Sequence, residues 1–198
     1  MELAYGDDFE SHVEEFTPDL VKTLIFHSVG DSPERKQRQL DLLARIARWC
    51  GEQHFQLMIE VLITGMADAK GSYGHGSELA RALTDSLEEI HLAGIDADVW
   101  KIDGLDSAEG ASSVALSLQE TSKGSFLVLG SGASLESVTQ WIRNAAACPS
   151  YRGFAVGRSV WTEPVGRYLE GHCSASEAVA DTAGNFEMLA NVFLSGRG

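Results

Sequence analysis

The chain has little cysteine, and its three cysteines do not form a pattern. Cys50, Cys148 and Cys173 lie far apart, include no Cys-x-x-Cys pair and leave one residue over in any pairing. Disulfide frameworks and structural zinc sites need cysteines that are paired at regular spacing, so this composition argues against both. Unpaired cysteines suit a reducing compartment. We therefore expect a cytoplasmic protein that has no disulfide framework.

Basic residues are also scarce. The chain has 15 Lys and Arg residues against 29 Asp and Glu residues, which gives a formal net charge of −14 at pH 7. Proteins that bind nucleic acids or anionic membranes usually present a basic surface, so we expect neither partner. A phosphorylated small molecule is not excluded, because a few local cations and backbone N–H groups can hold a phosphate in an acidic protein.

Several longer patterns are missing as well. No apolar run is long enough to span a bilayer, and the acidic N-terminal segment lacks the basic and apolar regions of a signal peptide. Spacings such as His-x-His and His-Glu-x-x-His are absent, which disfavours a metal-dependent site. No Gly-x-Gly-x-x-Gly follows the first expected strand, which weakens a dinucleotide-binding fold. We expect neither a metal nor a cofactor.

What the chain does contain is an alternation of short apolar runs and helical patterns. The expected strands are residues 21–27, 55–63, 97–102, 126–129 and 153–156. The expected helices are residues 33–49, 77–92, a segment after Asp106, 134–146, a segment from Thr162, and 176–193, with Ser174 and Glu177 as a capping box. Continuous apolar strands are typical of parallel sheets that are covered on both faces. The pattern predicts one α/β domain, either a doubly wound open sheet or a (β/α)8 barrel.

Three ionisable residues lie in or beside these expected strands. Lys101 interrupts an apolar strand, where burial would disfavour the ammonium and favour the neutral amine that attacks carbonyl groups. It is a candidate Schiff-base nucleophile, or else a strand-end lysine whose amine reaches solvent. Glu60 is a candidate proton carrier near Lys101, or half of a structural salt bridge. Asp103 points to the same side as Lys101 if the strand continues, as a second acid or base or as a turn cap.

Short glycine turns follow the last two expected strands. Glycine lets backbone N–H groups approach a phosphate, and the following helix adds the positive end of its dipole. The last two strand loops of many barrels form one phosphate site, in which Arg158 would grip the phosphate through two hydrogen bonds. The alternative for Arg158 is an ion pair with Glu163. The residues predicted to bind phosphate are Gly130, Ser131, Gly132, Gly157 and Arg158.

Two further features are candidates for the same site. His27 ends the first expected strand and either reaches the substrate or is only a polar strand-end residue. The stretch from Gly65 to Gly76 is rich in glycine and includes His75. It is either a mobile active-site loop or a plain surface connection.

Two segments carry a resemblance to a known family, VWKIDGL at residues 99–105 and GFAVGRSVW at residues 153–161. They resemble DUF2090, an aldolase-like domain that is also found fused behind the sugar kinase of bacterial inositol catabolism. In that fusion the domain is assigned as 2-deoxy-5-keto-gluconate-6-phosphate aldolase. More distantly, the chain is similar to class I tagatose-bisphosphate aldolases. The resemblance extends along essentially the whole chain.

This resemblance implies a (β/α)8 TIM barrel and metal-independent aldol cleavage of a phosphorylated keto sugar through a lysine Schiff base. It implies that Lys101 is the Schiff-base lysine of the sixth strand and that Glu60 is the acidic residue of the strand before it. Lys22 matches a lysine of the fourth strand. The turns at residues 130–132 and 157–158 match the phosphate-binding loops of the family.

The chain departs from the family in one respect, because family members carry further residues before the point where this sequence starts. As aligned, residues 1–198 form a single incomplete TIM barrel, with five parallel βα units that correspond to strands four to eight. Five strands cannot close such a barrel, since strand number, tilt and shear are linked. An open sheet also exposes two edges and an apolar face. Three explanations of this departure are open. The start site is misassigned or the chain was shortened, or the chain pairs with a second copy of itself, or the chain is a remnant without catalysis.

We therefore expect a class I aldolase-like protein that forms a homodimer over the open side of the barrel. The first alternative is a catalytically inactive partial barrel that binds a sugar phosphate or a partner chain. The second is an isomerase or epimerase on the same scaffold, in which Glu60 is the base and Lys101 acts only through its charge.

Overall fold

The computed structural model describes residues 3, 5–28, 30–65, 76–118, 122 and 124–197. Five strands form one parallel sheet in the order β1-β2-β3-β4-β5. The strands are β1 (Leu20–Ser28), β2 (Gln56–Thr64), β3 (Val99–Asp103), β4 (Ser125–Leu129) and β5 (Tyr151–Ala155). The helices are a 3-10 turn (Gly6–Asp8), α1 (Phe9–Phe16), α2 (Pro33–Gln53), α3 (Ser77–Leu92), α4 (Ala108–Ser117), α5 (Leu135–Ala146), α6 (Arg158–Leu169) and α7 (Ala175–Ser195).

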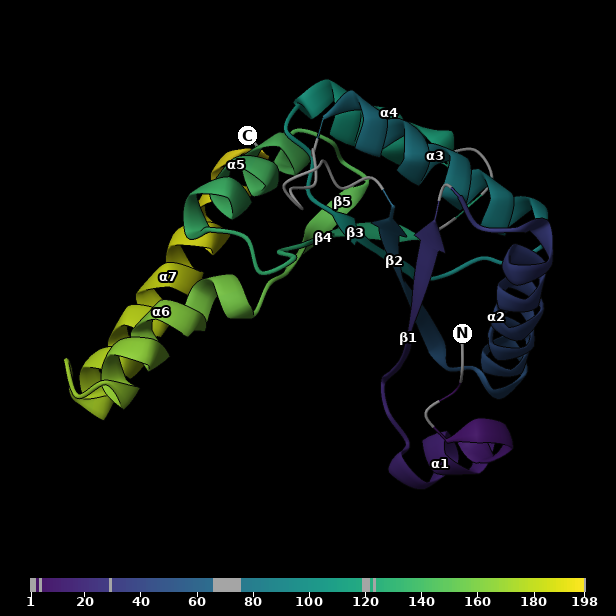
Figure 1. Ribbon diagram of the computed structural model, residues 1–198, viewed down its shortest axis with the longest axis horizontal. Coiled ribbons are helices and arrows are strands. Elements are labelled where there is room, and N and C mark those ends of the chain that lie inside the picture. Colours follow the sequence, from purple (N-terminus) through teal and green to yellow (C-terminus); the bar gives the residue numbers. More distant parts are fainter. Residues whose placement is uncertain are drawn as a thin grey trace.

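The helices lie on one side of the sheet. Each strand pairs with the next strand in the sequence, and right-handed crossovers in constant succession place the connecting helices on a single face. Figure 1 shows the helices α2 to α7 in an arc around the strands, with the other side of the sheet left open and α1 below β1. This arrangement is part of a barrel rather than the doubly wound sheet, which would carry helices on both faces. The predicted five βα units are therefore confirmed.

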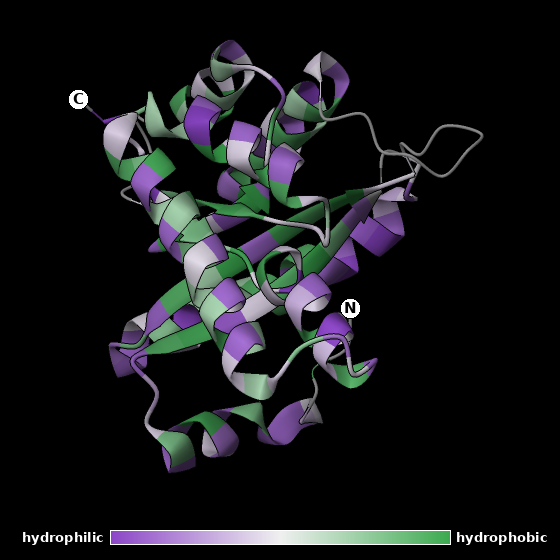
Figure 2. Cartoon of the chain, turned by 90° about the vertical axis from the view of Figure 1, so that its left-hand side faces the viewer, coloured by the Kyte–Doolittle hydropathy of each residue, from purple (hydrophilic) through white to green (hydrophobic). Residues whose placement is uncertain are grey.

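The core lies between the sheet and the arc of helices. Ile59 and Val61 of β2 and Trp100 and Ile102 of β3 face the helices, and the exposed fraction of each side chain is 0%. Figure 2 shows the strands coloured mainly as hydrophobic, whereas the helices carry both hydrophobic and hydrophilic residues. Each helix therefore buries one stripe of its surface against the sheet, as its spacing of apolar residues predicts.

A glycine at the end of β3 allows α5 to pack closely against the sheet. A β-carbon built on Gly104 would lie 2.5 to 2.6 Å from three atoms of Trp141 on α5. No side chain fits in that space. The indole of Trp141 in turn donates a hydrogen bond from Nε1 to Asp106 at 2.8 Å. The turn after β3 is therefore held against α5 at the end of the sheet where the candidate site lies.

The helices α1, α2 and α6 differ from the sequence-based expectation, and α2 ends at Gln53 rather than at residue 49. Helix α1 was not expected, because it has only eight residues and no side chain caps its N-terminus. Its Phe9 is buried against Trp49 of α2, with ring centroids 5.5 Å apart, so tertiary packing stabilises it. Helix α6 begins at Arg158 rather than at Thr162, which places Arg158 in the first turn.

The longest helices are α2 and α7, with 21 residues each. The predicted capping box at the start of α7 is present, since Ser174 and Glu177 each bond the backbone of the other. Within the described ranges, no helix combines the length and the apolar composition that crossing a membrane would need.

Candidate functional site

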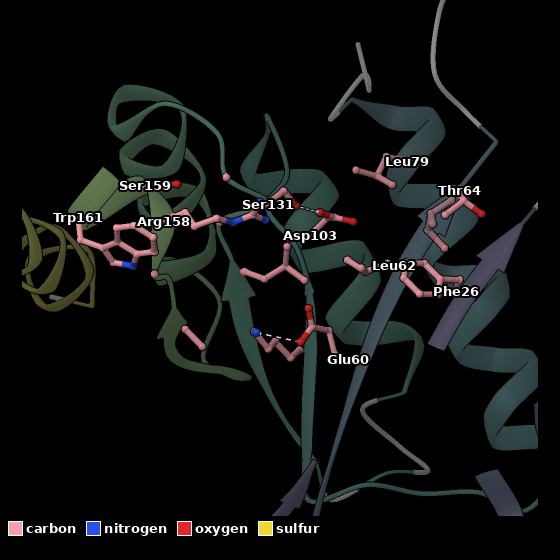
Figure 3. Close-up of a pocket in the computed structure, with 17 residues that line it drawn as sticks. Phe26, Glu60, Leu62, Thr64, Leu79, Asp103, Ser131, Arg158, Ser159 and Trp161 are labelled. Atoms are coloured by element: carbon pink, nitrogen blue, oxygen red, sulfur yellow. Dashed lines mark hydrogen bonds and ion pairs between the residues drawn. The ribbon is translucent and has the colours of Figure 1, made fainter. Parts of the chain in front are cut away.

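A hollow of about 570 Å³ lies at the carboxyl ends of the strands, on the open face of the sheet (Figure 3). All five strands contribute to its wall, together with the turns after β4 and β5. Ligands of barrels and of parallel sheets bind at this end, because the loops that follow the strands converge there. The lining side chains with polar groups are Glu60, Thr64, Lys101, Asp103, Ser131, Arg158, Ser159 and Trp161.

Glu60 lies between two lysines on the open face. Its Oε2 atom is 2.9 Å from Nζ of Lys101 on β3 and 2.9 Å from Nζ of Lys22 on β1. The strand register explains the first contact, since Glu60 and Lys101 are directly paired neighbours. The side chains of Glu60 and Lys101 are 10% and 18% exposed, whereas that of Lys22 is 42% exposed. The structure thus brings together three residues that the sequence-based analysis singled out separately.

The two lysines keep the Glu60 carboxyl group ionised. Burial alone would raise the pKa of Glu60, but hydrogen bonds and charges from Lys101 and Lys22 outweigh burial and lower this pKa below its ordinary value. An ionised carboxylate in direct contact with an amine can take a proton from it and return the proton later. The arrangement can therefore move a proton at the Nζ atom of Lys101.

Asp103 lies on the same face as Lys101, as the period of a strand predicts. Its side chain is buried and accepts a hydrogen bond from the hydroxyl of Ser131, in the turn after β4. Pairing of Asp103 with Leu129 brings the end of β3 beside this turn. Ser131 has a φ of 49°, in the left-handed region, and the backbone N–H of Ala133 closes the turn on Gly130 at 2.8 Å.

The guanidinium of Arg158 lies against the turn that contains Ser131. A β-carbon built on Gly132 would be 3.2 Å from Cζ of Arg158, and the φ of 74° at Gly132 favours glycine there. As the first residue of α6, Arg158 lies where backbone N–H groups have no intrahelical acceptor. Ser159, the next residue, has a buried Oγ without a hydrogen-bond partner in the part of the chain that the structure describes.

The alternative reading of Arg158, as the ion-pair partner of Glu163, does not hold. Glu163 lies 3.6 Å from Arg167, one turn further along α6. Among the residues that the structure places, Arg158 makes no ion pair. A cation without a carboxylate partner, beside two glycine turns and the start of a helix, is a favourable place for an anion.

His27 does not reach this hollow, contrary to the expectation from the sequence. Successive strand residues face opposite sides, and because Phe26 lines the hollow, His27 faces the helices. Its Nε2 atom lies 3.6 Å from Oε2 of Glu89 on α3. Burial, and then the charge of Lys36, lowers the pKa of His27 below its ordinary value.

The sequence-based analysis missed several residues that line the hollow. Trp161 is 43% exposed and lies three residues after Arg158, in the first turn of α6, which the sequence-based analysis started only at Thr162. Phe26 and Leu79 offered no signal beyond their apolar character. The expected mobile loop falls on residues 66–75, outside the described residues, and so does His75. Within the described ranges, no group of three or more His, Cys, Asp or Glu residues could hold a metal ion.

Comparisons with known proteins show the family and the fold of the chain. The family model DUF2090, described as an uncharacterized protein conserved in bacteria, matches residues 1–197. No curated protein matches the chain. A fructose-bisphosphate aldolase from Plasmodium falciparum, solved with TRAP and an inhibitor, has a TM-score of 0.71 and 12% identity over 96% of this chain and 61% of its own.

Two further solved structures are similar. A Schiff-base-forming fructose-1,6-bisphosphate aldolase has a TM-score of 0.62 and 20% identity over 90% of this chain and 61% of its own. The Corynebacterium glutamicum protein Cgl0159 has a TM-score of 0.65 and 19% identity over 94% of this chain and 55% of its own. This chain thus spans 55% to 61% of the length of these proteins. At such identities the likeness shows the fold, which resembles part of an aldolase barrel.

Proposed function

Because the chain belongs to the family DUF2090 and its fold resembles part of a class I aldolase barrel, we propose that it is a Schiff-base aldolase-like protein. Its substrate would be a phosphorylated keto sugar, such as 2-deoxy-5-keto-gluconate 6-phosphate. The observation that carries the proposal is the contact of 2.9 Å between Nζ of Lys101 and Oε2 of Glu60 in the hollow at the carboxyl ends of the strands.

In this proposal Lys101 is the nucleophile. Glu60 takes a proton from the amine, and the nitrogen lone pair attacks the carbonyl carbon of the substrate. The former carbonyl oxygen then receives two protons, one from the attacking nitrogen and one returned by Glu60, and leaves as water, which forms an iminium. The carbon–carbon bond then breaks, its electron pair moves to the iminium nitrogen as an enamine, and the departing fragment leaves as an aldehyde after its hydroxyl proton is removed. Protonation of the enamine and addition of water release the second product and restore Lys101.

Lys22 supports this chemistry through Glu60. Its charge, 2.9 Å from the same carboxylate oxygen, stabilises the ionised form of Glu60 when Lys101 is neutral or bonded to substrate. Without Lys22, the carboxylate would have no neighbouring cation whenever the Lys101 nitrogen is neutral, as the free amine or as the enamine. Lys22 is therefore placed to stabilise the charge of the site through the reaction cycle.

The phosphate of the substrate would bind at the other end of the hollow. The guanidinium of Arg158, the turn around Gly132 and the start of α6 offer hydrogen-bond donors and positive potential there. Binding of the phosphate orients the carbonyl group towards Lys101, so that binding energy from a remote group lowers the barrier of the reaction.

The experiment that tests the proposal is reductive trapping. The protein is incubated with dihydroxyacetone phosphate, reduced with borohydride and weighed intact by mass spectrometry, and the modified peptide is then sequenced. We expect one covalent adduct on Lys101 and none in a Lys101→Met variant. Lys36→Met is the control, because Lys36 pairs with Glu89 on the helix-covered side of the sheet. An adduct that persists in Lys101→Met at the wild-type level would contradict the mechanism.

A second function is binding without chemistry. The observation in its favour is that the guanidinium of Arg158, the turn around Gly132 and the start of α6 could hold a phosphate without any contribution from Lys101 or Glu60. Binding of dihydroxyacetone phosphate by calorimetry, without any trapped adduct, would support it. The homodimer over the open face stays a prediction, and analytical ultracentrifugation of the purified chain would test it.

A further inference from the structure

Trp161 is an exposed tryptophan in the wall of the hollow. Its side chain is 43% exposed, whereas the other three tryptophans of the chain are buried. An indole left in water forgoes the burial that stabilises a fold, so a large aromatic side chain kept at the wall of a cavity is typical of a binding residue. Figure 3 shows Trp161 at the same end of the hollow as Arg158 and away from Phe26. The end of the hollow that suits an anion therefore has an aromatic wall.

The polar atom of this indole borders the start of α6. A β-carbon built on Gly157, the N-cap of α6, would lie 3.5 Å from Nε1 of Trp161. Gly157 has no side chain to cap the helix, so the indole nitrogen lies beside the position where a capping group would accept hydrogen bonds. The N–H groups of Arg158 and Ser159 precede the first bond within the helix, which Val160 donates to the carbonyl of Gly157 at 2.9 Å. An acceptor from a ligand would meet backbone and indole donors together at this position.

The side-chain donors beside this position are not used by the protein itself. Trp100 and Trp141 each donate a hydrogen bond from Nε1 to a side-chain oxygen, whereas the described residues offer no acceptor to Nε1 of Trp161. The buried hydroxyl of Ser159 also lacks a partner among them. Several donors without acceptors match a negatively charged group that has several acceptor oxygens. A phosphate dianion is such a group.

We infer that Trp161 is a specificity residue for phosphate. Its Nε1–H donates a hydrogen bond to a phosphate oxygen that Arg158 and the start of α6 hold, and its indole ring covers this phosphate from solvent. The inference rests on the proposed function, because it takes the anion to be the phosphate of the substrate, and it adds a binding residue to the same site. Exclusion of water by the indole strengthens the attraction between the guanidinium and the phosphate, since the local dielectric constant falls.

The test uses dihydroxyacetone phosphate together with dihydroxyacetone, which has the same carbonyl group but no phosphate. Calorimetry measures the affinities for dihydroxyacetone phosphate and for inorganic phosphate, and borohydride trapping measures the adduct on Lys101 from each ketone. Trp161→Phe keeps an aromatic ring and lacks the N–H, so we expect both affinities to fall about 5-fold or more. Trapping of dihydroxyacetone should stay within about twofold of the wild-type level, because the lost hydrogen bond goes to the phosphate.

The fluorescence of Trp161 and a matched variant supply the controls. Because Trp161 is exposed, covering it with dihydroxyacetone phosphate should shift its emission to shorter wavelength, and this shift should be absent in Trp161→Phe. Tyr168→Phe is the control variant, since Tyr168 is exposed on α6 outside the hollow and also loses a polar hydrogen. It should keep the wild-type affinities and the emission shift.

Each outcome separates this inference from the proposed function. An adduct on Lys101 together with unchanged affinities in Trp161→Phe would overturn the role of Trp161 and keep the aldolase proposal. An equal loss with both ketones would also overturn that role, because a purely structural residue gives this pattern. Weaker phosphate binding in Trp161→Phe, without any adduct in the wild-type protein, would keep the role of Trp161 and overturn the Schiff base. Binding of neither dihydroxyacetone phosphate nor inorganic phosphate would overturn both.

Discussion

The two faces of the sheet carry different kinds of residue, although they alternate along the same strands. On β3, Trp100 and Ile102 face the helices and are fully buried, while Lys101 and Asp103 face the open side and line the hollow. On β2 the apolar neighbours of Glu60 also face the helices. The helix-covered face supplies the hydrophobic burial that stabilises the fold, and the open face holds the ionised groups. Substitutions on the two faces should therefore separate stability from chemistry.

The largest effect on stability is expected at Trp100. Trp100→Ala removes a large side chain from the helix-covered face, and we expect the free energy of unfolding to fall by about 3 to 5 kcal/mol. Urea denaturation followed by circular dichroism measures this change. The matched substitution on the other face of β3 is Lys101→Ala. A loss of stability as large as that of Trp100→Ala would show that the open face also carries the core.

Gly104→Ala should have the next largest effect. The new β-carbon would lie 2.5 to 2.6 Å from Trp141, so we expect a loss of about 1 to 3 kcal/mol as the turn and α5 move apart. Gly184→Ala in α7 is the control, because its β-carbon meets no atom within 4 Å and alanine favours the helix. Thermal unfolding should show a lower midpoint for the first variant and an equal or higher midpoint for the second.

Lys101→Met tests the open face of the sheet, where we expect a loss of chemistry rather than of stability. We expect it to abolish trapping while the free energy of unfolding changes by only about 1 to 2 kcal/mol, because Glu60 keeps its contact with Lys22. Double substitution of Lys22 and Lys101 by Met should cost more stability than the two single changes combined, since it leaves the carboxylate without a cation. Strict additivity in urea denaturation would contradict the three-residue arrangement.

The smallest effect concerns the pH dependence of stability. The pKa of Glu60 is lowered in the folded state from an ordinary value of 4.5. The unfolded state therefore binds this proton more readily, and the stabilisation is present above about pH 4.5 and is lost as the pH falls through the folded-state pKa. Glu60→Gln should be less stable than the wild-type protein at pH 7, and the difference should narrow below pH 4.5. A difference that stays constant from pH 7 to pH 3 would contradict this linkage.

The fold was predictable from local patterns to a large extent. Short apolar runs separated by helical periods indicated five βα units, and the structure has them in that order. The presence and the ends of some helices were less predictable, because tertiary packing determines them. Helix α1 depends on the contact of Phe9 with Trp49, and the early start of α6 at Arg158 carried no signal in the residues around it.

The candidate site was predictable in part. Glu60 and Lys101 were visible because a charged side chain within an apolar strand is costly and calls for a partner, and Glu60 was expected near Lys101. The contact of Glu60 with Lys22 was not expected, because the register of β1 and β2 sets which side chains meet across residues far apart in the chain. The hydrogen bond between Ser131 and Asp103 joins the turn after β4 to the end of β3 in the same way.

The sequence alone determined the alternation of apolar and helical segments and the few charged residues within the apolar strands. It could do so because burial and the backbone period act on residues that are near one another in the chain. The sequence patterns do not determine which face of each strand stays open. Tertiary structure directed His27 towards the helices and Lys101 towards the hollow, since the hand of the crossovers places every helix on one side. It also placed Arg158 against Gly132, because neighbouring parallel strands bring their following loops together at one end of the sheet.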